Sequence, residues 1–472
     1  MFPAQVRSFV APLRRLRSVR SVATTAQGQK REGDISDAFA SLSGLTFEPL
    51  EPRFAQLKDH LIAGHEDAIR ESWKRLLASL REEIPTITAL GPKVVPEIDF
   101  KDIEKPSPEF VDEHKKRGVA VVRNVIPERE VLSMKQDLLE YIKANPQTKA
   151  FPAENPQVYE LYWSPAQIRA RSHPNLLKAQ RFLMEFWHSR DPNALISASH
   201  PTMYADRLRL RTPGDNRRWE EYDPWESSCR LPVVSDLYQG VGACSMFRMS
   251  QGWLSISETG PFEGTLLVNP LLSRATAYYL LRPFFSPKRS AADPTAETFD
   301  EAFLADNNWL LNSPQDSWLQ GATPGRGQEL NNALHPHLQL PKSMTHVPRV
   351  RPGDYVAWHC DSIHAVDRIH AGTSDSSVLY IPTCPLTVNN AQYLLRQREA
   401  FLEGTPSPDF GGGIGESKHA GRPGVEDVQT ASGGDEGMRA FGLAAWDSDE
   451  AGLTSGQREV MDRANKILGF YD

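Results

Sequence analysis

The sequence predicts an α+β fold: a double-stranded β-helix (jelly-roll) barrel with packed N-terminal helices and a loop-rich C-terminal extension. Apolar residues recur at helical spacing in the first third of the chain. From residue 204 onward, short apolar segments alternate with Gly- and Pro-containing turns, which indicates short strands. After Gly404 the composition changes to Gly, Ser, Asp and Glu. The 472 residues suffice for one large domain with additions, or for two domains.

The helical part begins near Phe54 and its apolar positions continue to residue 81. Those positions are Leu57, Leu61, Ile69, Trp73, Leu76, Leu77 and Leu80. Residues 84–108 contain five prolines and predict an irregular connection. A short helix from Pro108 to Arg117 and a buried strand from Val119 to Val122 follow, and the apolar spacing over 131–142 predicts a further helix.

An arginine-rich strand is predicted at residues 207–211. Arg207, Arg209 and Arg211 face one way, and Leu208 and Leu210 face the other, because side chains alternate along a strand. Such arginines could line a polar cavity that binds carboxylates. A solvated, charged strand face is the alternative.

The remaining strands follow in short segments. Residues 246–282 predict two strands joined by a Gly/Pro turn, with a helix from about Tyr278 to Phe285. Further strands are expected at Tyr355–His359 and Ser377–Ile381. Short strands separated by turns, after N-terminal helices, favour the jelly-roll arrangement.

The C-terminal extension, residues 405–472, is expected to be mostly loop up to about residue 456. A last helix is predicted near 455–468, because Thr454 and Gln457 have the spacing of a capping box and an apolar stripe follows them.

The first 31 residues carry seven Lys and Arg, several Ser and Thr, and no acidic residue. This composition is typical of a mitochondrial presequence, and a disordered basic tail is the alternative. We expect residues 1–31 to direct the chain to the mitochondrial matrix, with a cytoplasmic location otherwise. The main domain then spans 32–404. Loss of the presequence would take the net charge from -7 to about -14.

Composition excludes several classes of function. The net charge of -7 and pI of about 6.0 argue against nucleic acid as a partner, because phosphate binding needs a basic face. No run of about 18 apolar residues occurs, so no membrane span is expected. The four cysteines form no CxxC pair, which signals neither a zinc ribbon nor a disulfide framework. The expected partner is a small-molecule substrate.

The most informative segment runs from Pro352 to Val366 and brings His359, Asp361 and His364 within six positions. Imidazole and carboxylate together suit Fe(II), Mn(II) or Zn(II). His359 and Asp361 share a strand face, whereas His364 has the opposite parity and a turn would have to bring it back. Spacing alone leaves both a metal site and a set of structural histidines open.

The order Gly-Asp, apolar strand, Trp-His and Ile-His-Ala-Val resembles the distal-histidine strand of phytanoyl-CoA-dioxygenase-like oxygenases. The resemblance implies that His364 ligates iron and that His359 is structural or supports the ligand. From about Gly33 to Phe410 the chain is also similar to the YbiU-like family of the same superfamily. The matching stretches are Tyr204 to Asp215, Trp219 to Trp225, Ser235 to Tyr238, Phe247 to Leu272 and Gly353 to Pro385.

One departure from the family concerns the iron site itself. In the family, a Gly-Pro-His-Val-Asp-Gly-Gly motif follows the arginine strand and supplies the proximal histidine and aspartate. Here Pro213 to Asn216 runs directly into Arg217 to Tyr222, and this His-x-Asp segment is missing. A gene-model or splicing error, a degenerate oxygenase, and a site rebuilt from His364, His359 and Asp361 are the three explanations.

The resemblance implies an Fe(II)/2-oxoglutarate-dependent dioxygenase-like oxidoreductase that acts on a small molecule. Two imidazoles and one carboxylate would hold the iron, and 2-oxoglutarate would chelate it. The far carboxylate of 2-oxoglutarate needs a cation, for which Arg207, Arg209 and Arg248 are the candidates. For the chain as written we expect very weak iron binding and negligible turnover. The alternative is a non-catalytic member of the same fold that binds a ligand or a protein.

Overall fold

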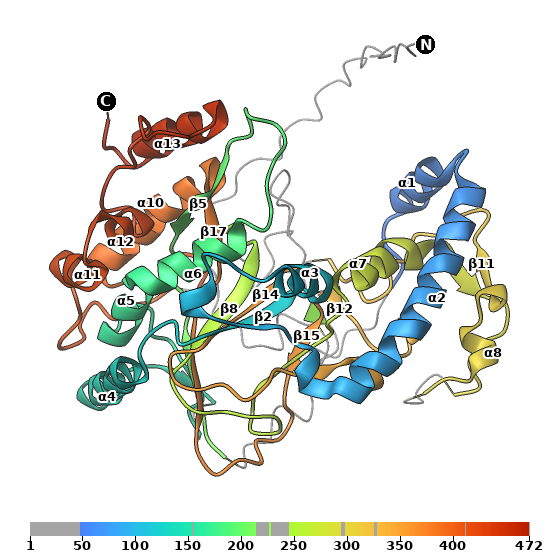
Figure 1. The fold of residues 1–472 in the computed structure, drawn as a ribbon, viewed down its shortest axis with the longest axis horizontal. Coiled ribbons are helices and arrows are strands. Elements are labelled where there is room, and N and C mark those ends of the chain that lie inside the picture. The colour runs from blue at the N-terminus through green and yellow to red at the C-terminus, as the bar shows by residue number, and fades with distance from the viewer. Residues whose placement is uncertain are drawn as a thin grey trace.

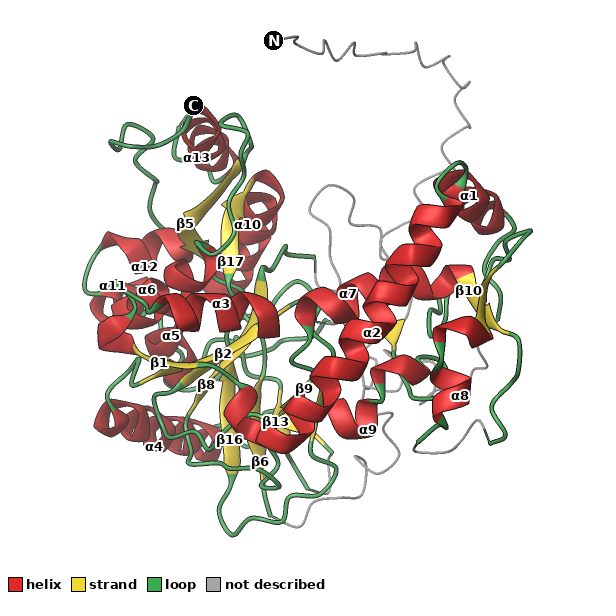
Figure 2. Cartoon of the chain, turned by 45° about the vertical axis from the view of Figure 1, so that its right-hand side comes forward, coloured by secondary structure: helices red, strands yellow, loops and turns green. Residues whose placement is uncertain are grey.

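The structure is a computed structural model of the chain, with the fold shown in Figure 1. It describes residues 48–152, 155–213, 245–293, 298–324, 328–410 and 412–471, and the backbone of 226–227. The expected presequence and the junction from Gly214 to Trp219 lie outside these residues. As predicted, the fold is mixed α+β, with helices packed around β-sheets (Figures 1 and 2). Within the described ranges, every helix is too short or too polar to cross a membrane.

Eight strands form the larger sheet, which is antiparallel except for the parallel pair of β1 and β2. Their order across the sheet is β1 (Glu97–Asp99), β2 (Val119–Arg123), β14 (Tyr355–His359), β8 (Ser250–Ser255), β16 (Ser376–Tyr380), β6 (Leu208–Arg211), β4 (Val158–Tyr159) and β3 (Ala150–Phe151). The predicted strands at 119–122, 207–211, 355–359 and 377–381 are all members of this sheet.

A second, antiparallel sheet has five short strands. Their order is β12 (Gln328–Glu329), β7 (Glu226–Ser227), β15 (His364–Val366), β9 (Leu266–Val268) and β13 (Thr345–His346). The two sheets are hydrogen-bonded separately, so the described residues form no closed barrel. The α+β class is therefore confirmed. The predicted jelly-roll barrel is not confirmed, because the described strands lie in two separate sheets. Two further strand pairs are β10 (Phe285–Pro287) with β11 (Trp309–Leu311) and β5 (Ile196–Thr202) with β17 (Cys384–Thr387).

The alternation of side chains along the larger sheet separates two cores. Trp253, Val356 and Val378 share one core with Leu266 and Val268 of the second sheet. The intervening residues pack on the other face, against α3 (Pro108–Arg117), α4 (Glu128–Ala144), α5 (Pro165–Ser172) and α6 (Pro174–Met184). The inner face of the larger sheet, which turns toward the second sheet, is where the candidate site lies.

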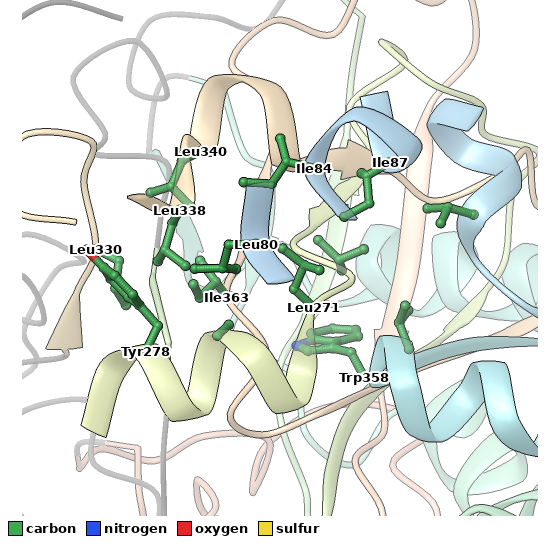
Figure 3. Close-up of a cluster of buried hydrophobic side chains, with 14 of the residues drawn as sticks. Leu80, Ile84, Ile87, Leu271, Tyr278, Leu330, Leu338, Leu340, Trp358 and Ile363 are labelled. Carbon is green, nitrogen blue, oxygen red and sulfur yellow. The ribbon is translucent and has the colours of Figure 1, made fainter. Parts of the chain in front are cut away.

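Of the two N-terminal helices, the second packs on the core that also contains β9 of the second sheet (Figures 2 and 3). They are α1 (Arg53–Ile62) and α2 (Glu66–Leu90), and they contact α7 (Leu272–Leu281), α8 (Glu301–Leu304) and α9 (Leu340–Ser343) or the loops between them. The single helix expected over 54–81 is divided at Gly64, whose φ of +79° suits glycine. The irregular connection expected from residue 84 is corrected, because α2 continues through Pro85 to Leu90. Its buried Ile84 and Ile87 hold this last part against the core (Figure 3).

The C-terminal part is more helical than expected. The helices are α10 (Val388–Glu403), α11 (Val425–Ser432), α12 (Asp435–Ala440) and α13 (Ser455–Ile467). The predicted last helix is confirmed, and Thr454 and Gln457 form its capping box. The loop expected over 405–456 is corrected, because α11 and α12 pack against α5 and gain their stability from that contact rather than from local sequence. The boundary at residue 404 remains a prediction. Short 3-10 turns occur at Gly91–Val94, Phe100–Asp102, Arg282–Phe284, Asp306–Asn308 and Pro336–Leu338.

Candidate functional site

His364 lies on the inner face of the second sheet. Its strand, β15, runs between β7 and β9, and His364 is paired in register with Glu226 and Val268. The side chain is buried, and its ring centroid lies 5.2 Å from that of Trp358 on β14 of the facing sheet. Nδ1 lies 3.0 Å from the carbonyl oxygen of Ser362 and donates a hydrogen bond to it. In the neutral imidazole this hydrogen bond leaves the lone pair on Nε2, as in histidines that ligate metals.

Trp358 adds a polar atom beside this histidine. Its indole Nε1–H is buried and has no hydrogen-bond acceptor among the described residues. Buried donors in native structures are usually paired, so an unpaired one calls for a physical reason. An oxygen-bearing small molecule held between the two sheets near His364 would supply an acceptor.

His359 and Asp361 do not join His364. His359 follows Trp358 on β14, so its side chain leaves the opposite face of the sheet, and its ring centroid lies 5.2 Å from that of Trp187. The backbone N–H of Asp361 donates to His359 Nδ1 at 3.1 Å, and the carboxylate Oδ2 lies 3.8 Å from the same nitrogen. Burial lowers the pKa of His359, although the charge of Asp361 opposes this shift. These three residues therefore form no single cluster.

No set of three His, Cys, Asp or Glu side chains in the described part of the chain is grouped so that it could hold a metal ion. The described residues therefore do not bring His359, Asp361 and His364 together, which was one of the three explanations considered. Strand parity already separated His364 from His359 and Asp361. The turn between β14 and β15 places His364 in the other sheet. His364 on its own remains a candidate ligand.

The arginines of β6 share one face of the strand, as predicted, and that face points inward rather than into solvent. Leu208 and Leu210 belong to the core beneath the helices, and Arg209 is paired in register with the inward-facing Val378. Arg209 is 3% exposed, and its guanidinium donates to the carbonyl oxygen of Gly264 at 3.3 Å. Arg211 is fully buried and donates to the carbonyl oxygens of Asp367 and Arg368 at 2.6 and 2.8 Å. Arg211 thus ties the larger sheet to the loop after β15.

The guanidinium groups of Arg207 and Arg248 lie near the same group of aromatic rings. The guanidinium carbon of Arg207 lies 4.8 Å from the ring centroid of Phe410, and that of Arg248 lies 5.8 Å from the ring centroid of Tyr204. The Tyr204 and Phe410 centroids are 6.3 Å apart. The side chain of Arg207 is 45% exposed, so it can meet a solvent-borne anion, whereas Arg209 is enclosed.

No pattern in the sequence predicted a buried pair formed by His346 and Asp367. His346 Nε2 lies 2.6 Å from Asp367 Oδ1, and Oδ2 accepts a hydrogen bond from the backbone N–H of Thr265 at 3.0 Å. The two residues come from β13 and from the loop after β15, 21 positions apart. No local motif spans such a separation, so only the folded chain reveals the contact.

Comparison with known proteins identifies the family. The model of the Gig2-like family matches residues 48–218 and 216–443, so the match is divided at the junction where the His-x-Asp segment is missing. YbiU of Escherichia coli (strain K12) is 28% identical over 446 residues, which cover 82% of this chain and 98% of YbiU.

Two crystal structures are similar to the fold. GlcNAc Inducible Gene 2, GIG2, of Candida albicans is 28% identical with a TM-score of 0.76, over 90% of this chain and 96% of that one. A Salmonella typhimurium LT2 protein, provisionally described as an oxidoreductase, is 26% identical with a TM-score of 0.65, over 84% of this chain and 98% of that one. The expected resemblance to the YbiU-like group is confirmed, and this chain belongs to the Gig2-like family.

Proposed function

We propose that this chain is an oxidoreductase of the Fe(II)/2-oxoglutarate-dependent dioxygenase type, acting on a small molecule, whose metal site is incomplete in the 472-residue sequence. The observation that carries the proposal is His364. It is buried on the inner face of one sheet, and the hydrogen bond from Nδ1 to the Ser362 carbonyl directs the lone pair of Nε2 away from the backbone. The description of the Salmonella relative as an oxidoreductase agrees with this proposal.

The order of the strands supports a jelly roll as the underlying architecture. Along the chain, β6, β8, β14 and β16 belong to the larger sheet, and β7, β9, β13 and β15 belong to the second. Among these eight strands, neighbours along the chain therefore alternate between the sheets, apart from β9 and β13. The short strand β12, which precedes β13, also belongs to the second sheet. Eight strands in two facing sheets with this alternation are the pattern of a jelly roll. We propose that the two sheets are its two halves.

The residues present do not fit a complete iron site. A facial site needs two imidazoles and one carboxylate, and the described residues assemble no group of three such ligands. The sequence from Gly214 to Cys244, which surrounds β7, contains no histidine at all. A second imidazole from the strand beside His364 is therefore absent by sequence, and no catalytic step can be derived from this chain.

We propose that Arg209, rather than Arg207 or Arg248, would hold the far carboxylate of 2-oxoglutarate. It faces the space between the sheets, is buried, and its Nε has no acceptor among the described residues. A buried guanidinium with unused donors matches the geometry of a carboxylate. The same enclosed arginine favours the second candidate function, a non-catalytic protein that binds a small dicarboxylate in the same place.

A chain with the missing segment restored tests this proposal. The segment of the E. coli relative that aligns between Asp215 and Trp219 is inserted, and iron content and succinate formation from 2-oxoglutarate are measured. We expect about one iron per chain and 2-oxoglutarate-dependent succinate in the restored chain, because two ligands are returned beside His364. His364→Ala in the restored chain is expected to lose both, whereas His359→Ala should keep the iron.

Two results would contradict the proposal. A folded, restored chain that gains no iron would refute the dioxygenase assignment. Full iron occupancy in the restored His364→Ala variant would show that His364 is not a ligand.

The second candidate function, a non-catalytic protein that binds a small dicarboxylate, predicts that the unmodified chain binds 2-oxoglutarate in titration calorimetry without added iron. It also predicts that Arg209→Met abolishes this binding.

A further inference from the structure

A pocket of about 490 Å³ opens between α2, α8 and α9, on the lobe formed by the N-terminal helices. Its walls come from segments that are far apart in the sequence but held together. Thr88 Oγ1 on α2 donates a hydrogen bond to the carbonyl oxygen of Lys342 on α9 at 3.0 Å. Ile84 and Leu340 of the same two helices belong to the buried core behind the pocket (Figure 3). The pocket is therefore a fixed feature of the fold, of the size that small-molecule sites have.

The floor of the pocket is apolar. It is formed by Ile84, Pro85, Ala89, Phe299 and Leu304. Apolar surface of this kind gains free energy when a hydrocarbon chain covers it, by about 25 cal/mol for each Å² removed from water. The floor therefore favours a ligand with an aliphatic body.

The rim of the pocket carries two cations and one acid. Arg81 and Lys342 line it together with Glu301. Arg81 is exposed and has no acidic partner among the described residues, and Lys342 Nζ reaches only the amide oxygen of Gln339, at 3.3 Å. Two cations against one carboxylate leave a net positive rim, which attracts an anionic head group.

Pro85 adds a backbone acceptor at the same place. Proline inside α2 has no N–H, so it cannot donate to the carbonyl oxygen of Arg81 one turn earlier. Arg81 and Pro85 both line the pocket. The Arg81 carbonyl, which lacks this helical donor, and the Glu301 carboxylate would repel a bare anion but would accept a hydrogen bond from a hydroxyl beside it.

From this juxtaposition we propose that the pocket between α2, α8 and α9 binds an amphipathic hydroxy acid, with its carboxylate at Arg81 and Lys342, its hydroxyl at the Arg81 carbonyl, and its alkyl chain on the apolar floor. This site is separate from His364 and does not depend on iron. It belongs to the described part of the chain and would serve as a second ligand site of the protein.

Titration calorimetry of the full 472-residue chain with 3-hydroxydecanoate, below its critical micelle concentration, tests the proposal. We expect one site per chain. Decanoate, which lacks the hydroxyl, should bind several-fold more weakly, and 1-decanol, which lacks the acid, at least tenfold more weakly. Arg81→Gln should weaken the binding of 3-hydroxydecanoate at least tenfold. Ala89→Trp, at an exposed position of the wall, should block it.

Lys74→Gln is the matched control, because Lys74 is an exposed cation of α2 outside the pocket. It should leave the affinity unchanged, and the thermal midpoints of all three variants should stay near that of the unmodified chain. Absence of binding, a stoichiometry well above one, equal binding of 1-decanol, or an equal effect of Lys74→Gln and Arg81→Gln would each overturn the proposal.

Discussion

Acid is expected to unfold this protein steeply below about pH 6, because three histidines are buried in the neutral state. Burial lowers the pKa of His335 and His337 from 6.5 to about 3, and that of His114 to about 4. His337 is surrounded by the rings of Trp73, Tyr278 and Trp309, which cannot solvate an imidazolium. The nearby guanidinium of Arg282 lowers the pKa of both His335 and His337 further.

The lowered pKa values of these histidines decide in which direction the stability changes with pH. Above pH 6.5 these histidines are neutral in both the folded and the unfolded chain, so their contribution to stability is fully present. As the pH falls toward 3, the unfolded chain takes up protons that the folded chain refuses, and the free energy of unfolding falls by about 1.4 kcal/mol per pH unit for each histidine. The three together would exhaust a typical stability of about 5–15 kcal/mol within a few pH units.

Urea unfolding at a series of pH values measures this slope. His337→Asn removes one titrating group while it keeps a polar side chain near Tyr278, whose hydroxyl lies 3.2 Å from His337 Nδ1. We expect the slope between pH 6 and 4.5 to become shallower by about 1.4 kcal/mol per pH unit, whatever the variant costs at neutral pH. His60→Asn on the exposed face of α1 should keep the original slope. An unchanged slope in His337→Asn would contradict the buried, neutral state.

Loss of Glu416 is expected to destabilise the protein by about 3–5 kcal/mol, because each of the three hydrogen-bond donors left without an acceptor in the interior costs about 1–3 kcal/mol. The side chain is fully buried. Oε1 accepts hydrogen bonds from the backbone N–H groups of Tyr162 and Trp163 at 2.6 and 2.8 Å, and Oε2 accepts one from the hydroxyl of Tyr141 at 3.0 Å. Burial raises the pKa of Glu416, and the hydrogen bonds and the buried guanidinium of Arg171 oppose this shift.

Glu416→Ala would leave those three donors without an acceptor. Glu82→Ala, on the exposed face of α2, is the control and should change the unfolding free energy by less than about 0.5 kcal/mol. Glu416→Gln keeps one acceptor oxygen and should lie between the two. Equal urea midpoints for Glu416→Ala and Glu82→Ala would show that the segment after residue 405 contributes little to the fold.

The sequence could predict those helices and strands whose ends are marked by residues close to them in the chain. The helix Pro108–Arg117 has Ser107 as its N-cap, proline in its first turn and Gly118 in the left-handed conformation at its end, all of which are legible in the sequence. Strand alternation predicted that Arg209 and Arg211 share a face, but it left open whether that face is buried or solvated. The extension of α2 through Pro85 could not be predicted, because it depends on a core that Ile84 and Ile87 share with α7 and α9.

The candidate site was predicted in part for the same reason. Strand parity separated His364 from His359 and Asp361, and the structure places His364 in the other sheet. The buried contact of His346 with Asp367 and the unpaired indole N–H of Trp358 were not predicted, because both depend on which strands face each other across the two sheets. Non-local pairing of this kind leaves no spacing in the sequence.

The iron content of the purified, unmodified 472-residue chain tests the central claim most directly. The chain is incubated with Fe(II) without oxygen, passed through a desalting column, and its iron is measured against protein concentration. We predict far less than one iron per chain, because a lone imidazole at position 364 does not hold a ferrous ion through that step. One tightly bound iron per chain would contradict the account, because it would require a complete set of ligands where this sequence has none.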